Sequence, residues 1–357
     1  MNIYVVIPKS FAGCGFYRLY QPHNHLAKNY NVNVTLGSGF QKTEISAFTD
    51  EELREFDIII WHKTLFDLAD IKRARDLGIT TIADFDDHWV VNREHTLYKE
   101  YLKEGLPARL HKLLLAVDHV TCTTETLADE IYKHNKNVVV LPNAVDRGYD
   151  GWKNERITED KYTFGYLGGP CHTRDVALLR GVQESLSGEF MFRLFGFNGT
   201  DIYNHYADIL SGGKASDKFS LYKGADIFNY PQFYNYMDCS LVPLEANSFN
   251  RMKSELKLIE AGAFAKAVIV SGVEPYTDIA RHEKNCLIAN SKQDWIDSCK
   301  RLIKDNSLGR ALGRQLEEDT ADYDISVVNK KRYKFYKNVQ SNSNKSSRTR
   351  LSGVEHI

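Results

Sequence analysis

The sequence predicts an α/β protein built from two doubly wound domains, each with a parallel sheet. The chain has 357 residues, which is more than one compact core usually holds. Short β-branched runs alternate with segments of helical periodicity, as expected for parallel sheets with crossover helices. The alternation stops at a polar, turn-rich stretch near residue 145 and then begins again.

The first half predicts one domain over 1–145. Its apolar runs are expected to form strands at 3–7, 32–36, 57–61, 80–83, 119–121 and 138–141. Helical periodicity is found between them, at 18–29, 65–77, 97–117 and 126–134. Pro107 is expected to split or kink the third helix, because proline lacks the amide proton that a helix interior needs.

A linker is expected over 146–160, and a second Rossmann-like domain over 161–322. Its predicted strands are 164–167, 190–195, 240–243, 267–270 and 286–289. Its predicted helices are 175–186, 203–210, 231–237, 253–263, 292–304 and 308–319. A helix within 323–340 is expected to return to the first domain, and the polar tail 341–357 is expected to be disordered. Two such sheets are expected to face a central cleft at the carboxyl ends of their strands.

Composition narrows the function classes. The formal net charge is -1, so the overall balance requires neither nucleic acid nor an anionic membrane as a partner. The six cysteines show no metal-ligand spacing and are expected to be reduced thiols of a cytoplasmic protein. The start of the chain does not read as a signal peptide, and the apolar runs are of strand length, so no stable membrane insertion is expected.

The most informative segment is 247–263. On a helical wheel Lys253, Lys257 and Glu260 fall within roughly 60° of one another, between apolar flanks. A mostly buried helix with such a stripe needs a partner for its charges. A nucleoside diphosphate fits: Lys253 and Ser254 in the first turn would meet phosphate, and Glu260 would accept ribose hydroxyls. The alternative is an amphipathic helix whose Lys–Glu pair faces solvent.

The run PLEANSFNRMKSELKLIEAGAFAKAVIVSGVEPYTDI, residues 243–279, resembles the donor-binding region of retaining GT-B glycosyltransferases of the sucrose-synthase/mannosyltransferase type, the glycosyl transferases group 1. LPNAVD at 141–146 is similar to the interdomain segment of that family, and FGYLGG at 164–169 to the first strand of its C-terminal domain. Gly13, Gly15 and Arg18 resemble its N-terminal glycine loop. The GxGxYR run at 13–18 and the DxDD run at 84–87 also look similar to those of compact glycosyltransferases of bacteriophage genomes.

The resemblance, the charged stripe of 253–260 and placement at the ends of predicted strands together suggest roles for particular residues. Donor-binding groups are expected at Gly13, Gly15, Gly169, His172, Arg174, Asn198, Ser254, Lys257 and Glu260. Lys253, Arg18 and Asp87 are expected to be catalytic, the two cations by stabilising charge on the leaving phosphate. Two departures stand out. Met252 occupies the place of a family glutamate, with Glu245 and Glu255 as the candidate substitutes, although Glu255 projects from the opposite side of the helix. The usual Arg-x4-Lys phosphate clamp is missing, with His172 and Arg174 nearest to it.

The acidic run after the strand at 80–83 is expected on the acceptor side. Asp86, Asp87 and His88 lie in this run, and Lys63 follows a neighbouring strand. A clustered DxDD is also compatible with a divalent cation or with structural capping. Because the GT-B resemblance implies metal-independent transfer, no metal ion or other cofactor is expected.

The resulting hypothesis is a hexosyl- or pentosyltransferase that retains anomeric configuration. The acceptor is left open between a glycan, a lipid-linked sugar, a protein and hydroxymethylated duplex DNA, and the oligomeric state is also open. A DNA acceptor would use basic residues near the end of the chain: Lys330, Lys331, Arg332, Lys334, Lys337, Lys345, Arg348 and Arg350. The alternatives are a non-catalytic GT-B protein that binds nucleotide sugars and a nucleotide-sugar epimerase.

Overall fold

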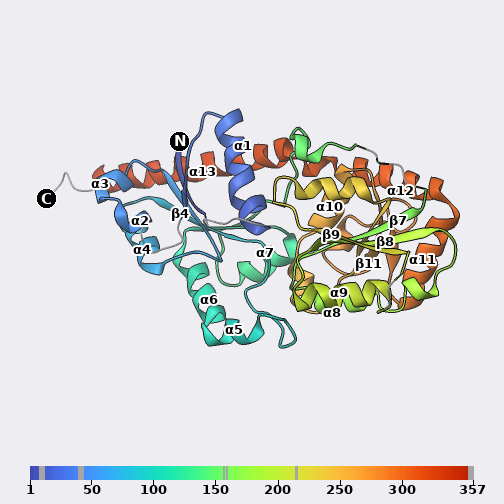
Figure 1. Cartoon of the computed structure of the whole chain (residues 1–357). Helices are drawn as coiled ribbons and strands as arrows, with labels where there is room; N and C mark the ends of the chain where they lie inside the picture. The colour runs from blue at the N-terminus through green and yellow to red at the C-terminus, as the bar shows by residue number, and fades with distance from the viewer. Residues whose placement is uncertain (8–12, 39–43, 156, 158–159, 214–215, 353–357) are drawn as a thin grey trace. The chain divides into compact units, whose positions relative to one another are not determined.

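The computed structural model describes residues 1–7, 13–38, 44–155, 157, 160–213 and 216–352 (Figure 1). The chain divides into two compact units. Unit 1 contains Met1–Val91, Lys99–Ala144 and Ile325–Ile357, and unit 2 contains Asn92–Tyr98 and Val145–Asp324. Unit 1 therefore includes the last helix, as expected for a C-terminal return to the first domain. Among the described residues, no helix combines the length and apolar character needed to cross a bilayer.

Unit 1 is built on a parallel six-stranded sheet of order β2-β1-β3-β4-β5-β6. Its strands are β1 (Asn2–Ile7), β2 (Asn33–Ser38), β3 (Ile58–His62), β4 (Thr80–Phe85), β5 (His119–Cys122) and β6 (Val138–Val140). All six were predicted from the sequence. The central strands β3 and β4 are buried at every residue, which explains their continuous apolar runs.

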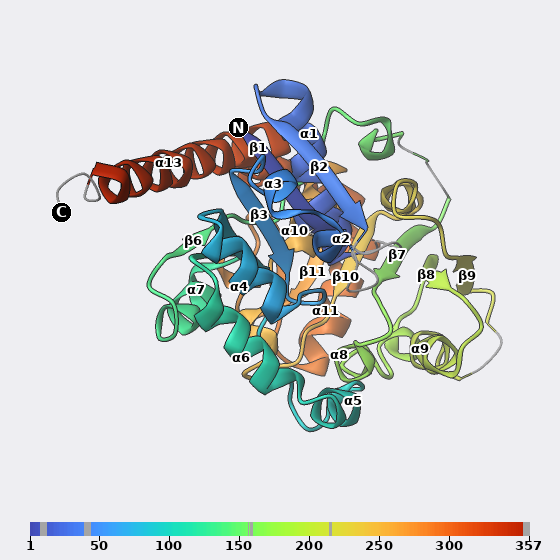
Figure 2. The same ribbon diagram turned by 90° about the vertical axis from the view of Figure 1, so that its left-hand side faces the viewer.

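Helices cover both faces of this sheet. They are η1 (Gly15–Tyr20, a π-helix), α1 (Gln21–Asn29), α2 (Glu44–Ala47), α3 (Asp50–Leu53), α4 (Leu68–Asp76), α5 (Tyr98–Lys103), α6 (Leu106–Ala116), α7 (Glu125–Tyr132) and α13 (Ile325–Ser352). Figure 2 shows α4 and α6 on one side of the sheet and α1 and α13 on the other. Leu26 of α1 and Tyr336 of α13 belong to one apolar core with β1, β3 and β4.

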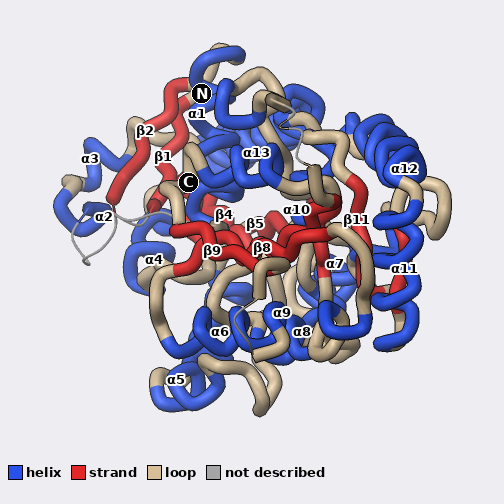
Figure 3. The backbone as a smooth tube through the Cα atoms, turned by 45° about the vertical axis from the view of Figure 1, so that its right-hand side comes forward, coloured by secondary structure: helices blue, strands red, loops and turns tan. Residues whose placement is uncertain are grey.

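Unit 2 has a second parallel sheet of order β12-β11-β10-β7-β8-β9. Its strands are β7 (Tyr162–Leu167), β8 (Phe190–Phe197), β9 (Phe219–Lys223), β10 (Cys239–Val242), β11 (Ala267–Ser271) and β12 (Leu287–Ala289). Its helical segments are η2 (Asp150–Trp152), α8 (Thr173–Ala177), η3 (Gln183–Ser185), α9 (Asp201–Ser211), η4 (Tyr230–Tyr236), η5 (Asn250–Met252), α10 (Leu256–Ala263), η6 (Tyr276–Asp278), α11 (Lys292–Lys304), α12 (Asn306–Asp319) and η7 (Ala321–Tyr323). Figures 1 and 3 show α10 on one side of this sheet and α8 and α9 on the other.

Several elements differ from their predicted form. The helix predicted at 97–117 is two helices, since Gly105 adopts the left-handed conformation (φ 60°) and Pro107 lies in the first turn of α6. Strand β9 was missed because it is an edge strand whose residues are only partly buried. The helix α13 continues to Ser352, through much of the tail predicted to be disordered. That stretch contains no glycine or proline, the two residues that most disfavour a helix interior, before Gly353. Residues 353–357 lie outside the described residues.

The interior of unit 1 contains an ion pair between Arg18 of η1 and Asp84 of β4. Arg18 Nε and Nη2 donate to the two carboxylate oxygens at 2.9 and 2.8 Å, and both side chains are almost fully buried. Thr121 donates a further bond to Asp84 at 2.6 Å, and Arg18 Nη1 donates to the Leu141 carbonyl at 2.7 Å. Burial opposes ionisation of Asp84, but Arg18 outweighs it and holds the pKa of Asp84 below its ordinary value.

A second buried polar contact joins α1 to α13. His23 Nδ1 lies 2.6 Å from the Leu19 carbonyl, and Nε2 lies 2.9 Å from the Tyr336 hydroxyl. A carbonyl only accepts, so Nδ1 carries the proton and Tyr336 donates to Nε2. Burial, reinforced by the charge of Arg332, lowers the pKa of His23 to about 3. His23 is therefore a neutral part of the core.

Replacement of Asp84 by Asn should destabilise unit 1, because it leaves the buried guanidinium of Arg18 without its counter-charge. We expect a loss of about 3–5 kcal/mol in the free energy of unfolding, measured by urea denaturation. The matched control is Asp76→Asn, which breaks the exposed Lys72–Asp76 pair and should cost about 0–1 kcal/mol. Equal effects of the two variants would contradict the structural role of Asp84.

The pH dependence of stability should carry the signature of His23. Between its unfolded pKa of 6.5 and its folded pKa of about 3, only the unfolded chain binds the proton, so stability falls as pH falls. From pH 7 to pH 5 the native chain should lose about 2 kcal/mol more than the His23→Gln variant. Parallel stability profiles for the two proteins in urea denaturation would show that His23 is not buried in its neutral form.

Candidate functional site

Each sheet has a point where the chain changes direction. In unit 1 the chain runs from β1 to β2 on one side and then to β3 on the other, and in unit 2 from β7 to β8 on one side and then to β10 on the other. Ligands of open α/β sheets bind at the carboxyl ends of the strands beside such a point. The loops after β7 and β10, and after β1 and β3, are therefore the candidate sites of the two units.

In unit 2 the loops after β7 and β10 are joined by a buried acid, Asp175. One carboxylate oxygen lies 2.7 Å from His172 Nδ1, and the other accepts the Glu245 amide at 2.7 Å and Asn250 Nδ2 at 3.0 Å. Burial lowers the pKa of His172, opposed by its bond to Asp175 and reinforced by the charges of Lys253 and Lys257. The positive charges of these two lysines are thus felt at His172.

Glu245 and Arg174 form an ion pair at this edge. Arg174 Nε lies 3.0 and 2.9 Å from the two Glu245 oxygens, and Nη2 donates at 2.5 Å. Both line a small cavity together with Asn247 and Asn250. Arg174 is about half exposed, so a ligand can reach it. The sequence placed Arg174 near the donor and offered Glu245 as a substitute for the family glutamate, and the structure brings these two side chains together. Glu245 comes three residues after the end of β10.

The lysine–glutamate stripe of 253–263 is rearranged in the structure. The prediction that Lys253 lies in the first turn of this helix is wrong. Its backbone is extended (ψ 177°), and Glu255 is the N-cap residue of α10. Lys253 Nζ lies 5.0 Å from the centre of the Phe249 ring. Ser254, between Lys253 and Glu255, is likewise outside the helix. The N-cap residue of the helix is therefore a buried glutamate, and Lys253 precedes the helix.

Glu260 is completely buried, which limits its predicted contact with a ribose. Its Oε2 accepts from Lys257 Nζ at 2.9 Å and from the Tyr234 hydroxyl at 2.8 Å. Lys257 Nζ is also 3.3 Å from the Tyr230 hydroxyl, and its side chain remains 28% exposed. Glu260 thus anchors a lysine whose side chain is partly exposed.

Two further predicted donor contacts differ in character. Gly169 accepts a bond from the Tyr206 hydroxyl at 3.1 Å, and a Cβ built on it would meet no described atom within 4 Å. The Gly169 backbone is thus open to close approach by a ligand. Asn198 instead closes the turn after β8, where its side-chain oxygen accepts from the amide and hydroxyl of Thr200.

In unit 1 the structure gives Arg18 a different place from the one expected. Its guanidinium is committed to Asp84 and to the Leu141 carbonyl, so it is not available to a leaving phosphate without breaking that core. Gly13 has a φ of +51°, and its carbonyl accepts the amides that begin the helical turn containing Gly15. The residues 10–12 of the predicted glycine loop lie outside the described residues.

The acidic run after β4 is paired with a lysine. Lys63 Nζ lies 3.0 Å from Asp86 Oδ1 and also forms an ion pair with Asp87. Lys63 is buried, whereas the two aspartates are 20% and 23% exposed. His88 contacts the Val90 carbonyl at 3.0 Å, and burial lowers its pKa. The sequence thus grouped Lys63, Asp86 and Asp87 correctly at one edge of the sheet.

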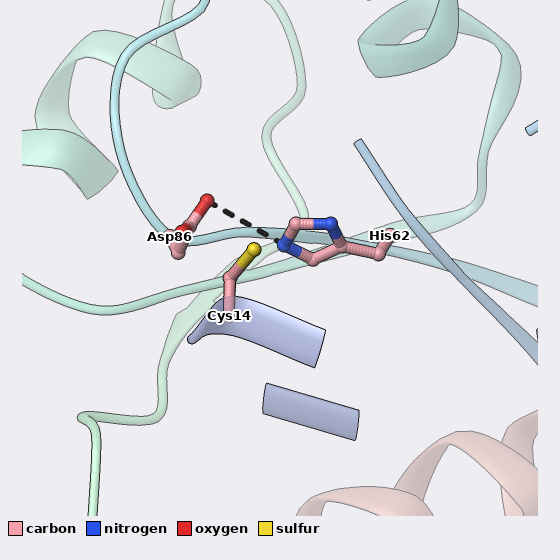
Figure 4. Close-up of side chains that lie close together, drawn as sticks. All are labelled: Cys14, His62 and Asp86. Atoms are coloured by element: carbon pink, nitrogen blue, oxygen red, sulfur yellow. Dashed lines mark ion pairs between the residues drawn. The ribbon is translucent and has the colours of Figure 1, made fainter. Parts of the chain in front are cut away.

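Sequence reasoning did not single out Cys14 and His62, which lie at the same edge. Figure 4 shows both side chains and Asp86 directed toward one another, and their ligand atoms lie within 4.8 Å of each other. Burial, reinforced by the charge of Asp86, raises the pKa of Cys14 to about 12, so this thiol is not poised as a nucleophile. The signal available was position, since Cys14 follows β1 and His62 ends β3.

Comparison with solved structures gives matches over nearly the whole chain, whereas no family model and no curated protein sequence matches. The sucrose-phosphate synthase of Thermosynechococcus elongatus covers 96% of this chain and 99% of its own, with a TM-score of 0.68 and 13% identity. Anabaena Alr3699/HepE, solved with UDP and glucose, covers 94% of this chain and 98% of its own, with a TM-score of 0.68 and 10% identity.

A further match is the pneumococcal O-GlcNAc transferase GtfA, solved with UDP and GlcNAc. It covers 81% of this chain and 59% of its own, with a TM-score of 0.58 and 15% identity. At these identities the comparisons establish the architecture. Together with two parallel six-stranded sheets, they show that the chain has the GT-B glycosyltransferase fold.

Proposed function

We propose that this protein is a glycosyltransferase that takes its sugar from a nucleoside diphosphate sugar bound at the strand ends of unit 2. The observation that carries the proposal is the group of cations beside the switch point of that sheet, in a chain with the GT-B fold. Burial and the charges of Lys253 and Lys257 lower the pKa of His172, and Arg174 lies in the same loop as His172. A diphosphate is the ligand whose charge matches such a group.

In this proposal the protein itself balances the charge of the leaving diphosphate. Lys253 and Lys257 would contact the phosphate oxygens, and no metal ion is needed on the diphosphate. Glu260 acts as a positioning residue, because its carboxylate holds Lys257 at 2.9 Å. Ser254 and the open backbone of Gly169 would complete the phosphate contacts. The two solved structures with bound UDP support UDP as the first nucleotide to test.

Glu245 is proposed to contact the donor sugar. The family glutamate expected eight positions before Glu260 is replaced here by Met252. Glu255 is not a good substitute, because it is buried at the N-cap of α10. Glu245 lies at the end of β10, lines the small cavity and keeps 27% of its side chain exposed. Its ion pair with Arg174 would hold the carboxylate in place, and a sugar hydroxyl would replace one of the contacts with Arg174 when the donor binds.

Transfer with retention of configuration is part of the proposal. The acceptor would approach along the acidic edge of unit 1, where Asp87 and His88 remain partly exposed. Of the eight basic residues considered for a DNA acceptor, Arg332 is 1% exposed and donates to Asn329. We take a glycan or lipid-linked sugar as the first acceptor class to test.

The proposal is tested by calorimetry with UDP, GDP, ADP, CMP and their sugar conjugates, followed by measurement of nucleotide release with candidate acceptors. Selective binding of one nucleotide, with release that requires both sugar donor and acceptor, is the expected result. Binding without turnover in any acceptor mixture would favour the non-catalytic alternative. Conversion of the donor sugar without acceptor would favour an epimerase.

Replacement of Lys253 by Ala should weaken nucleotide binding by about tenfold or more, since a charge-assisted contact contributes about 1.5–3 kcal/mol. The matched control is Arg310→Ala, which removes an exposed cation lining a cavity at the amino ends of the same strands. Its affinity should stay within about twofold of the native value. Equal losses in the two variants would argue against a phosphate contact at Lys253.

Replacement of Glu245 by Gln should separate binding from transfer. Because the carboxylate is assigned to the sugar and not to the nucleotide, affinity for UDP should stay within about twofold, while transfer falls about tenfold or more. The control is Glu274→Gln. Glu274 lies in the loop after β11 and, like Glu245, forms an ion pair with an arginine, here Arg251. Native turnover in Glu245→Gln, measured as UDP release with saturating donor, would remove Glu245 from the site.

A further inference from the structure

Three side chains at the carboxyl edge of unit 1 form a group that glycosyl transfer does not explain. Cys14 follows β1, His62 ends β3 and Asp86 follows β4, and these three strands are neighbours in the sheet. Their Sγ, Nε2 and carboxylate oxygen atoms lie within 4.8 Å of one another (Figure 4). The group lies wholly in unit 1, beside the switch point between β1 and β3.

His62 supplies an observation that points to a ligand. Its side chain is only 1% exposed, and the one contact of Nε2 given by the described residues is an ion pair with Asp86. A buried ring nitrogen that lacks a well-formed hydrogen bond is costly, so the arrangement requires an explanation. Nε2 is aimed at Asp86 Oδ1, which lies 3.4 Å away, beyond a good hydrogen bond.

The same separation suits two ligands of one zinc ion. Tetrahedral geometry with Zn–N and Zn–O bonds of about 2.1 Å places the nitrogen and oxygen about 3.4 Å apart. A Zn–S bond of about 2.3 Å places the sulfur about 3.6 Å from each of them, and the three ligand atoms here lie within 4.8 Å of one another. A thiolate with an imidazole and a carboxylate is a donor set that favours zinc over magnesium or calcium.

We propose that Cys14 Sγ, His62 Nε2 and Asp86 bind one zinc ion, with a fourth ligand supplied by solvent. Three protein ligands leave this fourth position open, and Asp86 and Cys14 are both partly exposed at the edge. On binding, the Zn–S bond replaces the S–H bond of Cys14, and the proton leaves to solvent. The proposal is independent of the donor site in unit 2.

The surrounding charges balance when zinc is bound. Zn²⁺ is neutralised by the Cys14 thiolate and the Asp86 carboxylate. Lys63, which pairs with both Asp86 and Asp87, keeps Asp87 as its partner. Arg18 keeps Asp84. Each buried cation at this edge is thus matched by its own carboxylate, without an excess of either sign.

A neighbour also orients the imidazole. His62 Nδ1 lies 2.8 Å from the Thr64 hydroxyl and accepts the Thr64 amide at 3.2 Å, so Nε2 carries the proton in this structure. When zinc binds Nε2, the proton moves to Nδ1, which donates it to the Thr64 hydroxyl. Hydrogen bonds of this kind fix the tautomer and ring orientation of metal-binding histidines. Thr64 is therefore a positioning residue for the proposed zinc ion.

The test is a metal titration of the purified full chain after treatment with a chelator. Zinc should bind with one equivalent, measured by competition with a chromophoric chelator. Cobalt(II), used as a spectroscopic probe, should give a thiolate-to-metal charge-transfer band. Cys14→Ser and His62→Gln should weaken zinc binding by about 100-fold or more, and Thr64→Val by about 10–100-fold. Circular dichroism checks that each variant is folded.

Matched controls are Cys171→Ser, which changes another partly exposed thiol, and His88→Gln, which changes a histidine next to the acidic run. Both should bind zinc as the native chain does. Zinc should also protect Cys14 of the native chain from alkylation, detected by peptide mass spectrometry, and this needs no mutation. Absence of stoichiometric zinc binding, a cobalt band that persists in Cys14→Ser, or alkylation of Cys14 that zinc does not slow would each overturn the proposal.

Discussion

The buried ion pair between Arg18 and Asp84 is the interaction on which the arrangement of unit 1 depends. It joins the helical turn after β1 to β4, and Thr121 and the Leu141 carbonyl extend it to the following strands. Such a pair is held only if every polar atom is satisfied, which restricts the backbone around it. Cys14 lies four residues before Arg18, and Asp86 lies two residues after Asp84. The pair therefore sets where these two side chains emerge at the sheet edge.

In unit 2 a buried carboxylate, Asp175, likewise joins loops that come from different strands. This buried carboxylate binds His172 from the loop after β7 and the Glu245 amide and Asn250 from the loop after β10. The two loops on either side of the switch point are thus fixed by one acid. The lysines and arginine around them remain partly exposed, as Lys257 and Arg174 show. A rigid acidic centre surrounded by accessible cations is an arrangement suited to a phosphate ligand.

Much of the fold could be predicted from the sequence, because parallel strands are long apolar runs and the helices between them have clear periodicity. All six strands of unit 1 and α11 at 292–304 follow these rules. The strand β9 was not predicted, since an edge strand with partly exposed residues has no continuous apolar run. The two short helices α2 and α3 were not predicted either, because four residues are too few to reveal helical periodicity.

The site could be predicted less well, and the reason is physical. Position along the chain placed Lys63, Asp86 and Asp87 at one sheet edge, but it could not show which charges neutralise one another. Arg18 was expected at a phosphate and is instead part of the core. Periodicity placed Lys253 in a helix, whereas its extended backbone and the N-cap at Glu255 move it outside. Long-range pairs of this kind depend on tertiary contacts, which local patterns do not encode.

The central claim is that the nucleotide binds to the loops after β7 and β10 of unit 2. Hydrogen–deuterium exchange of the full chain with and without saturating UDP tests it directly, because it locates the contact without any mutation. The account predicts slower exchange in residues 168–176 and 244–258. Unchanged exchange in both segments while UDP binding is confirmed by calorimetry would contradict it.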